Sequence, residues 1–96
     1  MDMRNSDTNT DQVDIVALGA LRFLACETER FSRFLTLSGL TPEDIAPLAS
    51  QPDFLASVMD YLLSDEKLLL EFAESESLQP QTIAAMRRKL PGAPQI

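Results

Sequence analysis

Few side chains of this 96-residue chain could carry out catalysis. The sequence contains no histidine, which removes the commonest general base and a frequent metal ligand. It contains one cysteine, Cys26, and a cysteine without a histidine is a poor nucleophile and an incomplete metal site. Ser38 precedes Gly39, but a turn between two helices explains that corner without any nucleophile. We therefore expect no catalytic residue, no metal site, no cofactor and no enzymatic activity.

The charged residues are numerous, but their spacing is typical of helix ends and solvated faces. Asp65 and Glu66 are adjacent, as in the first turn of a helix, and Arg87 begins a basic run that closes another predicted helix. The formal net charge is −7, which opposes binding to nucleic acid and to anionic membranes. We expect neither as a partner.

The cysteine count and the hydropathy pattern also bear on location. A single cysteine allows no intramolecular disulfide, which fits a reducing compartment. The sequence shows no apolar run of about 18 residues and no charged segment followed by an apolar leader. A cytoplasmic protein is the expectation.

Two similar stretches, residues 17–48 and 55–86, dominate the chain. Laid on each other without gaps at an offset of 38 residues, they keep apolar residues opposite apolar ones. Each stretch has one apolar face at helical spacing that it could not bury alone, so we expect the two to pack together, about a pseudo-twofold axis or as a short stack. The identical pairs are Leu24 and Leu62, Phe34 and Phe72, Leu40 and Leu78, Pro42 and Pro80, Ile45 and Ile83, and Ala46 and Ala84.

Helix boundaries are marked in both stretches. The apolar pattern keeps its phase across residues 26–28, so one long helix is possible there, but Ser64 and the two acids after it have the pattern of an N-cap and first turn. We favour a break at residues 26–28 and at Ser64. Gly39 is expected to end a helix in the left-handed conformation, and Thr41 and Pro42 to begin the next one.

These signals predict an all-α fold, a compact bundle of five or six helices built from the two similar units. Residues 11–90 form the expected single domain, between a disordered N-terminal tail (1–10) and a flexible C-terminal tail (91–96). The expected core positions are Leu21, Leu24, Phe31, Phe34, Leu40, Ile45, Phe54, Val58, Leu62, Leu69, Phe72, Leu78 and Ile83.

The run RFLTLSGLTPEDI, followed by DFLASVMDYLLSDEKLLLEFA and then LQP, resembles a family of short, uncharacterised alphaproteobacterial proteins that share a domain of unknown function. The resemblance covers about residues 17–90. It implies a bacterial protein and supplies no activity, cofactor or catalytic residue. Members often lie near genes for two-component response regulators, which makes a response regulator a candidate partner. The positions that carry the resemblance are Phe34, Leu35, Ser38, Gly39, Leu40, Pro42, Phe54, Leu55, Leu62, Asp65, Glu66, Phe72 and Ala73.

Small acidic helical domains without catalytic groups are more often binding partners than enzymes, so the leading hypothesis is a protein-interaction or regulatory adaptor. Tyr61 and Leu68 are seven residues apart, hence two turns along the same side of a helix, and Phe23 is at the position that matches Tyr61. We expect these three residues to mark an interaction face for another protein or for a second copy in a homodimer. The other interpretation is that the last helix, through Ile83 or Met86, folds over this side and buries it. The alternative is a binder of a small apolar ligand between the two units, in a pocket lined by Phe31, Met59, Phe72 and Met86.

Overall fold

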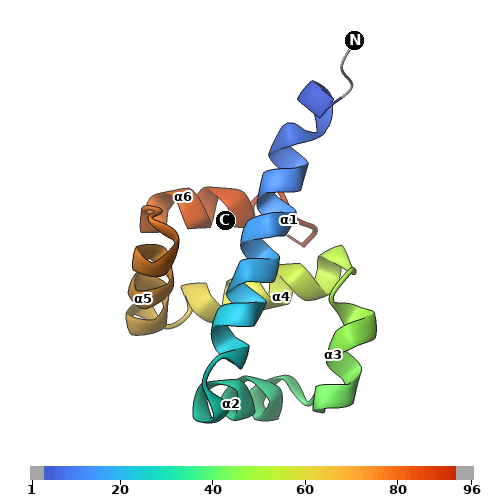
Figure 1. Ribbon diagram of the computed structural model, residues 1–96, viewed down its shortest axis with the longest axis vertical. Coiled ribbons are helices and arrows are strands. Elements are labelled where there is room, and N and C mark those ends of the chain that lie inside the picture. The colour runs from blue at the N-terminus through green and yellow to red at the C-terminus, as the bar shows by residue number, and fades with distance from the viewer. Residues whose placement is uncertain (1–3, 93–96) are drawn as a thin grey trace.

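The computed structural model describes residues 4–92, and it describes the side chains from residue 12 onward. Within this range the chain forms six helices and no strand, which confirms the all-α bundle (Figure 1). None of these helices has both the length and the apolar character needed to cross a membrane. The helices are α1 (Arg4–Ala25), α2 (Thr28–Ser38), α3 (Pro42–Leu48), α4 (Pro52–Leu63), α5 (Glu66–Glu76) and α6 (Pro80–Arg87).

The centre of the bundle is the contact between α1 and α4, the most extensive contact between any two helices (Figure 1). From the ends of these two helices the chain turns back: α2 packs on α1, and α5 packs on α4. Helix α6 then covers both α4 and α5. Helix α3 lies on the side of the molecule opposite α5 and makes no comparably extensive contact with α1 or α2 (Figure 1).

The helix bounds of the two halves agree at the offset seen in the sequence. Helix α2 begins and ends 38 residues before α5, and α1 and α4 end at Ala25 and Leu63. Pro42 begins α3 and Pro80 begins α6, again 38 residues apart. We call α1–α3 the first unit and α4–α6 the second unit. The expected breaks in the two long helical stretches are therefore confirmed.

The first helix starts earlier than the sequence predicts. Helix α1 begins at Arg4, whereas the apolar period that predicts it begins after Asp11. Extending an existing helix costs little free energy, because each added residue forms one more backbone hydrogen bond. The added turns therefore do not need an apolar face. Residues 1–3 and 93–96, in the two expected tails, lie outside the described residues, so the disorder expected there stays a prediction.

The corners that end α2 and α5 have the same geometry. Gly39 and Ser77 are both left-handed, with φ of 73° and 57°. The next amide closes each helix in the Schellman manner: Leu40 N–H donates to the Leu35 carbonyl at 3.0 Å, and Leu78 N–H donates to Ala73 at 2.9 Å. The predicted helix end at Gly39 is confirmed. At Ser77 the same corner uses a residue whose Cβ is unfavourable in this conformation.

The expected cap of α5 is displaced by one residue. Asp65, not Ser64, is the N-cap, and its carboxylate accepts a hydrogen bond from the Leu68 amide at 3.3 Å. Ser64 instead belongs to the end of α4, where its hydroxyl donates to the Tyr61 carbonyl at 2.7 Å. The reason is electrostatic: a carboxylate has the same reach as a hydroxyl here and adds a favourable charge at the positive end of the helix.

The core contains the positions that the sequence predicts. Phe31, Leu40, Ile45, Leu69 and Leu78 are half-buried and pack against it, and the other eight expected positions are buried. None of the thirteen is exposed. Small residues also belong to the core: Ala17 and Ala20 are fully buried in α1 and allow close packing of the two central helices.

The basic run at the end of α6 has a structural role that its sequence does not reveal. Arg87 is 5% exposed, and its guanidinium pairs with Asp60 of α4, with Nη2 donating to Oδ2 at 3.0 Å and Nε donating to Oδ1. The remaining N–H groups donate to the carbonyls of Leu90, Pro91 and Gly92. We expected Arg87 to cap the end of the helix, where a cation complements the helix dipole. It does bind carbonyls there, but it points inward and fixes the end of the chain to α4.

The two left-handed corners predict opposite effects of substitution. Ser77→Gly should raise the free energy of unfolding by about 0.5 to 1 kcal/mol, because glycine has no Cβ to strain the left-handed conformation. The gain is limited because glycine also increases the conformational entropy of the unfolded chain. Gly39→Val should lower it by about 1 to 2 kcal/mol, although open space surrounds the position. Urea unfolding of both variants tests this. If Ser77→Gly is destabilising, the strain assigned to Ser77 is wrong.

The Arg87 interactions predict that its shape matters as well as its charge. Arg87→Lys should lower the free energy of unfolding by about 2 kcal/mol, since lysine cannot satisfy Asp60 and three carbonyls from one planar group. Arg88→Lys, at the exposed neighbouring position, is the matched control and should be neutral. Thermal melting of both variants gives the comparison. Equal midpoints for the two variants would contradict the assigned role.

Candidate interaction groove

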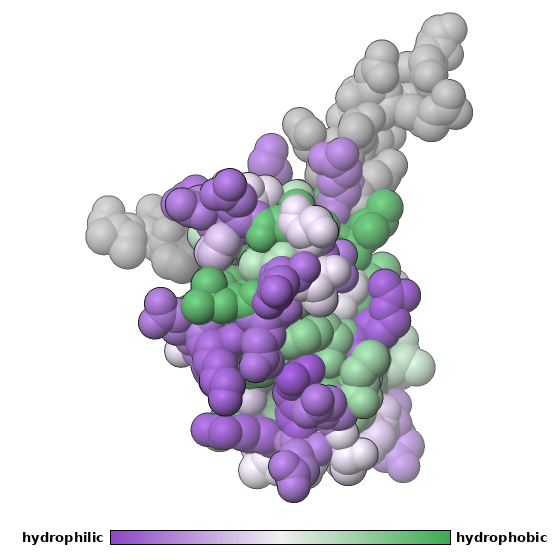
Figure 2. Space-filling view, turned by 60° about the vertical axis from the view of Figure 1, so that its left-hand side comes forward, coloured by the Kyte–Doolittle hydropathy of each residue, from purple (hydrophilic) through white to green (hydrophobic). Residues whose placement is uncertain are grey.

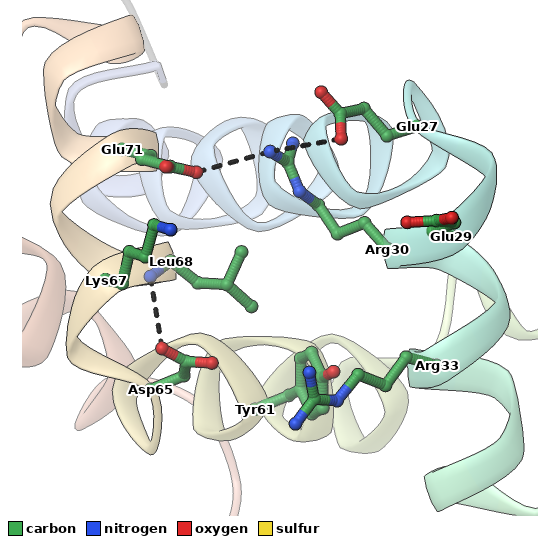
Figure 3. Close-up of a pocket in the computed structure, with 9 residues that line it drawn as sticks. All are labelled: Glu27, Glu29, Arg30, Arg33, Tyr61, Asp65, Lys67, Leu68 and Glu71. Atoms are coloured by element: carbon green, nitrogen blue, oxygen red, sulfur yellow. Dashed lines mark hydrogen bonds and ion pairs between the residues drawn. The ribbon is translucent and has the colours of Figure 1, made fainter.

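An open groove of about 560 Å³ lies between α2 and α5, with α4 along one side (Figure 3). Its walls begin at the N-caps of the two helices, Glu27 for α2 and Asp65 for α5. Polar and charged side chains form most of the lining, and Leu68 points into the space between the walls (Figure 3). The lining residues are Glu27, Glu29, Arg30, Arg33, Tyr61, Asp65, Lys67, Leu68 and Glu71.

The two units contribute corresponding positions to this groove. Apart from Tyr61, every lining residue has its partner at the offset of 38 residues in the lining itself. Figure 3 shows the members of each pair at opposite positions across the groove. The pairs are Glu27 and Asp65, Glu29 and Lys67, Arg30 and Leu68, and Arg33 and Glu71.

Two aromatic contacts show how the units are related. Phe23 of the first unit packs against Phe72 of the second, with ring centroids 5.4 Å apart. At the corresponding positions, Tyr61 of the second unit packs edge-on against Phe34 of the first at 5.1 Å. Reciprocal contacts of this kind arise from a twofold relation and not from a head-to-tail stack. Of the two arrangements that the sequence allowed, the contacts favour the pseudo-twofold one.

Arg30 fills one half of the groove, which we call the Phe23 half. Its guanidinium carbon lies 4.2 Å from the centroid of the Phe23 ring, and its Nη1 donates to the Phe23 carbonyl at 3.3 Å. Its Nη2 reaches across the groove to Glu71 at 3.2 Å and lies 3.6 Å from Glu27. The Arg30 side chain is only 18% exposed as a result. One side chain therefore connects α1, α2 and α5.

The other half, which we call the Tyr61 half, has no such filling. The position that matches Arg30 is Leu68, which is too short to reach across the groove and carries no charge. The position that matches Glu71 is Arg33. Glu29 precedes Arg33 by one turn of α2, but no ion pair joins these two exposed side chains. The Tyr61 half is thus open, and no ion pair between described residues crosses it.

The three residues of the predicted interaction face have different surroundings. Tyr61 and Leu68 are half-buried and both line the groove. The expectation that they share one side of one helix is wrong, because α4 ends between them at Leu63. They meet because α5 turns back beside α4. Phe23 is enclosed between the Arg30 guanidinium and the Phe72 ring, so it supports the groove from beneath.

Sequence reasoning missed the charged residues of the site. Arg30, Arg33, Lys67 and Glu71 have the spacing of a solvated helix face, and that interpretation left them without a role. A signal was present in the alignment of the two units: acid and base exchange places between Glu29 and Lys67, and again between Arg33 and Glu71. Reversed charge at matching positions is what two walls of one groove would show.

The alternative ligand pocket does not form at the expected residues. Met59 and Phe72 are fully buried in the core, and Phe31 and Met86 are half-buried against it. None of the four lines the groove between α2 and α5, and none lines the second groove, of about 380 Å³, which lies between the start of α4 and residues Leu40 and Leu48. The four residues belong to the core or pack against it, and the groove that does lie between the units is lined mostly by polar and charged side chains.

The pseudo-twofold relation predicts that the contacts of Arg30 in the Phe23 half can be reproduced in the Tyr61 half by substitution. In the double variant Leu68→Arg with Arg33→Glu, residue 68 should stack on Tyr61 and pair with residue 33, as Arg30 stacks on Phe23 and pairs with Glu71. Each substitution alone lacks its partner, so a double-mutant cycle from urea unfolding should show a favourable coupling of about 0.5 to 1 kcal/mol. A coupling of zero or of opposite sign would show that the two halves are not equivalent.

No curated protein and no solved structure matches this chain. One family model does, and it covers residues 10–93, which include all the residues of the groove and both units apart from the first turns of α1. The family carries the description "protein of unknown function", which is consistent with the family resemblance noted in the sequence. The chain belongs to this family, DUF3572.

Proposed function

We propose that this protein is a non-catalytic protein-interaction module, a regulatory adaptor that contacts its partner through the Tyr61 half of the groove. The observation that carries the proposal is the difference between the two halves. The chain fills the Phe23 half with its own Arg30, whereas Leu68 leaves the Tyr61 half open with an apolar floor and charged walls. An apolar anchor ringed by polar groups is the usual composition of a protein interaction site.

The distribution of apolar residues on the outer surface favours the groove, and not a flat apolar patch, as the interaction site. The run of three leucines at 68–70 is mostly covered: Leu70 is 49% exposed, but Leu68 and Leu69 are half-buried. On the face drawn in Figure 2, hydrophobic areas are separated from one another by hydrophilic side chains. Scattered exposed apolar residues of this kind are ordinary.

The composition supports a protein as the partner. A net charge of −7 disfavours nucleic acid and anionic membranes, and the groove itself carries four acids and three bases. The proposal needs no catalytic step and no cofactor. A cytoplasmic location and a response regulator as partner are the corresponding proposals for its setting, and a second copy of the chain is a further possible occupant. The small-ligand alternative has no comparable support, because the residues that would line its pocket are packed together.

The proposal predicts that a charge at the centre of the groove abolishes partner binding. The full chain should retain one or more partner proteins from a lysate of its native cells, and Leu68→Glu should lose them while Leu70→Glu, on the same helix outside the groove, keeps them. Mass spectrometry identifies the retained proteins. Calorimetry with the purified partner should then give affinities in the same order.

Folding and self-association need separate measurements. Thermal melting should place Leu68→Glu close to the unsubstituted protein, since Leu68 is only half-buried and lies at the groove. Sedimentation velocity reveals whether the occupant is a second copy, in which case the dimer disappears in Leu68→Glu. The proposal fails if all three proteins retain the same partners, or if none retains any partner and none self-associates.

A further inference from the structure

The charges of the Tyr61 half define the chemistry of its occupant. We propose that the segment bound there is acidic, and that it places a carboxylate against Arg33 with an apolar side chain beside it on Tyr61 and Leu68, while Lys67 adds positive charge on the opposite wall. This inference rests on the proposed function and adds the class of partner. The occupant is a segment of another protein that combines aspartate or glutamate with leucine or an aromatic residue.

The Phe23 half provides the template for what fills such a space. There the occupant is the chain's own guanidinium, which covers an aromatic ring and neutralises carboxylates on both walls, at 3.2 Å from Glu71 and 3.6 Å from Glu27. A planar group over a ring and an ion pair to the wall is therefore a combination that this groove geometry accommodates.

The Tyr61 half offers the same geometry with the opposite charge. Arg33 stands where the Phe23 half has Glu71, and Lys67 stands where it has Glu29. The remaining acid near this half, Asp65, already accepts the Leu68 amide as the N-cap of α5. Neither Arg33 nor Lys67 forms an ion pair with a described residue, whereas Arg30 pairs with Glu71 and Glu27. A partner that covers these cations therefore needs an anion, because an unpaired charge loses hydration without compensation.

The floor of this half adds an apolar requirement. Leu68 replaces the arginine of the other half, and the Tyr61 ring is fixed on one side by its edge-on contact with Phe34. Leu68 and Tyr61 would be covered by a ligand that lies between the walls, and covering them is favourable only if the ligand supplies apolar area. A carboxylate alone, or a strongly hydrated acidic run, would pair with the cations of the walls but would bring no apolar area to cover Tyr61 and Leu68.

The net charge of −7 opposes an acidic partner at long range, whereas the Tyr61 half of the groove carries two bases, Arg33 and Lys67, and one acid, Asp65. Exposed charges further apart than the Debye length of about 8 Å at physiological salt are largely screened, so the contact is decided by the charges that line the site. Salt therefore has two opposing effects on the affinity. Added salt weakens the local attraction and also weakens the repulsion from the rest of the surface, so the salt dependence should be shallow.

Selection of peptides from a random displayed library against the full chain tests the inference. The selected peptides should combine acidic residues with leucine or aromatic residues. Synthetic copies should bind the unsubstituted protein in fluorescence anisotropy and bind Arg33→Glu at least roughly tenfold more weakly. Arg88→Glu makes the same change of net charge at an exposed position on α6, outside the groove, and should keep the affinity within about twofold.

The outcomes separate this inference from the proposed function. Peptides that are lost with Leu68→Glu but are rich in lysine and arginine, or that bind Arg33→Glu unchanged, would overturn the acidic partner and leave the groove as an interaction site. If no peptide is selected, or if every selected peptide still binds Leu68→Glu, the groove is not the site and both proposals fail. Melting curves for Arg33→Glu and Arg88→Glu should show that both variants fold.

Discussion

The packing of α1 against α4 is the interaction on which the rest of the structure depends. Each unit has one apolar face, and neither could bury it alone. Ala17 and Ala20 of α1 leave little side chain between the helices, and Val58, Met59 and Leu62 of α4 are completely excluded from solvent. Because the same face of each unit takes part, the contact relates the units by an approximate twofold. The reciprocal ring pairs and the groove follow from that relation.

A twofold between two similar but non-identical units places matching positions opposite each other, where small differences have large effects. Replacing an arginine by a leucine at one position on an isolated helix would change little. In this fold the same difference has a large effect: Arg30 closes one half of the groove, whereas Leu68 leaves the other half open. The asymmetry is the physical basis of the proposed function, since it produces a site without changing the fold that supports it.

The third helices differ for a comparable reason. Ile83 is fully buried in α6, whereas the matching Ile45 in α3 is only half-buried. Arg87 contributes to this difference, because its pairing with Asp60 holds the end of α6 against α4, and the first unit has Ala49 at the corresponding position. The matching prolines determine where α3 and α6 begin. The contacts at the far end of each helix determine how closely it packs against the rest of the bundle.

Local chemistry explains what could be derived from the sequence alone. The helical units, the break near residue 27, the left-handed end at Gly39 and most of the core depend on residues a few positions apart: the apolar period, prolines at helix starts, and glycine where a Cβ is unfavourable. Even the error at Ser64 was a shift of one residue between two possible caps. The sequence also identified Tyr61 and Leu68, although for a reason that the helix break removes.

Only the tertiary structure decided which charged side chains act together. Arg30 pairs with Glu71 across 41 positions, and Arg87 pairs with Asp60 across 27. Neither pair has a local signal, because a charge on an exposed helix face and a charge lining a groove have the same sequence pattern. Phe23 illustrates the same limit: its position predicts a partly exposed ring, and the fold covers that ring with a guanidinium from the next helix. Helices form from near neighbours, whereas a site forms from surfaces that meet only when the helices pack.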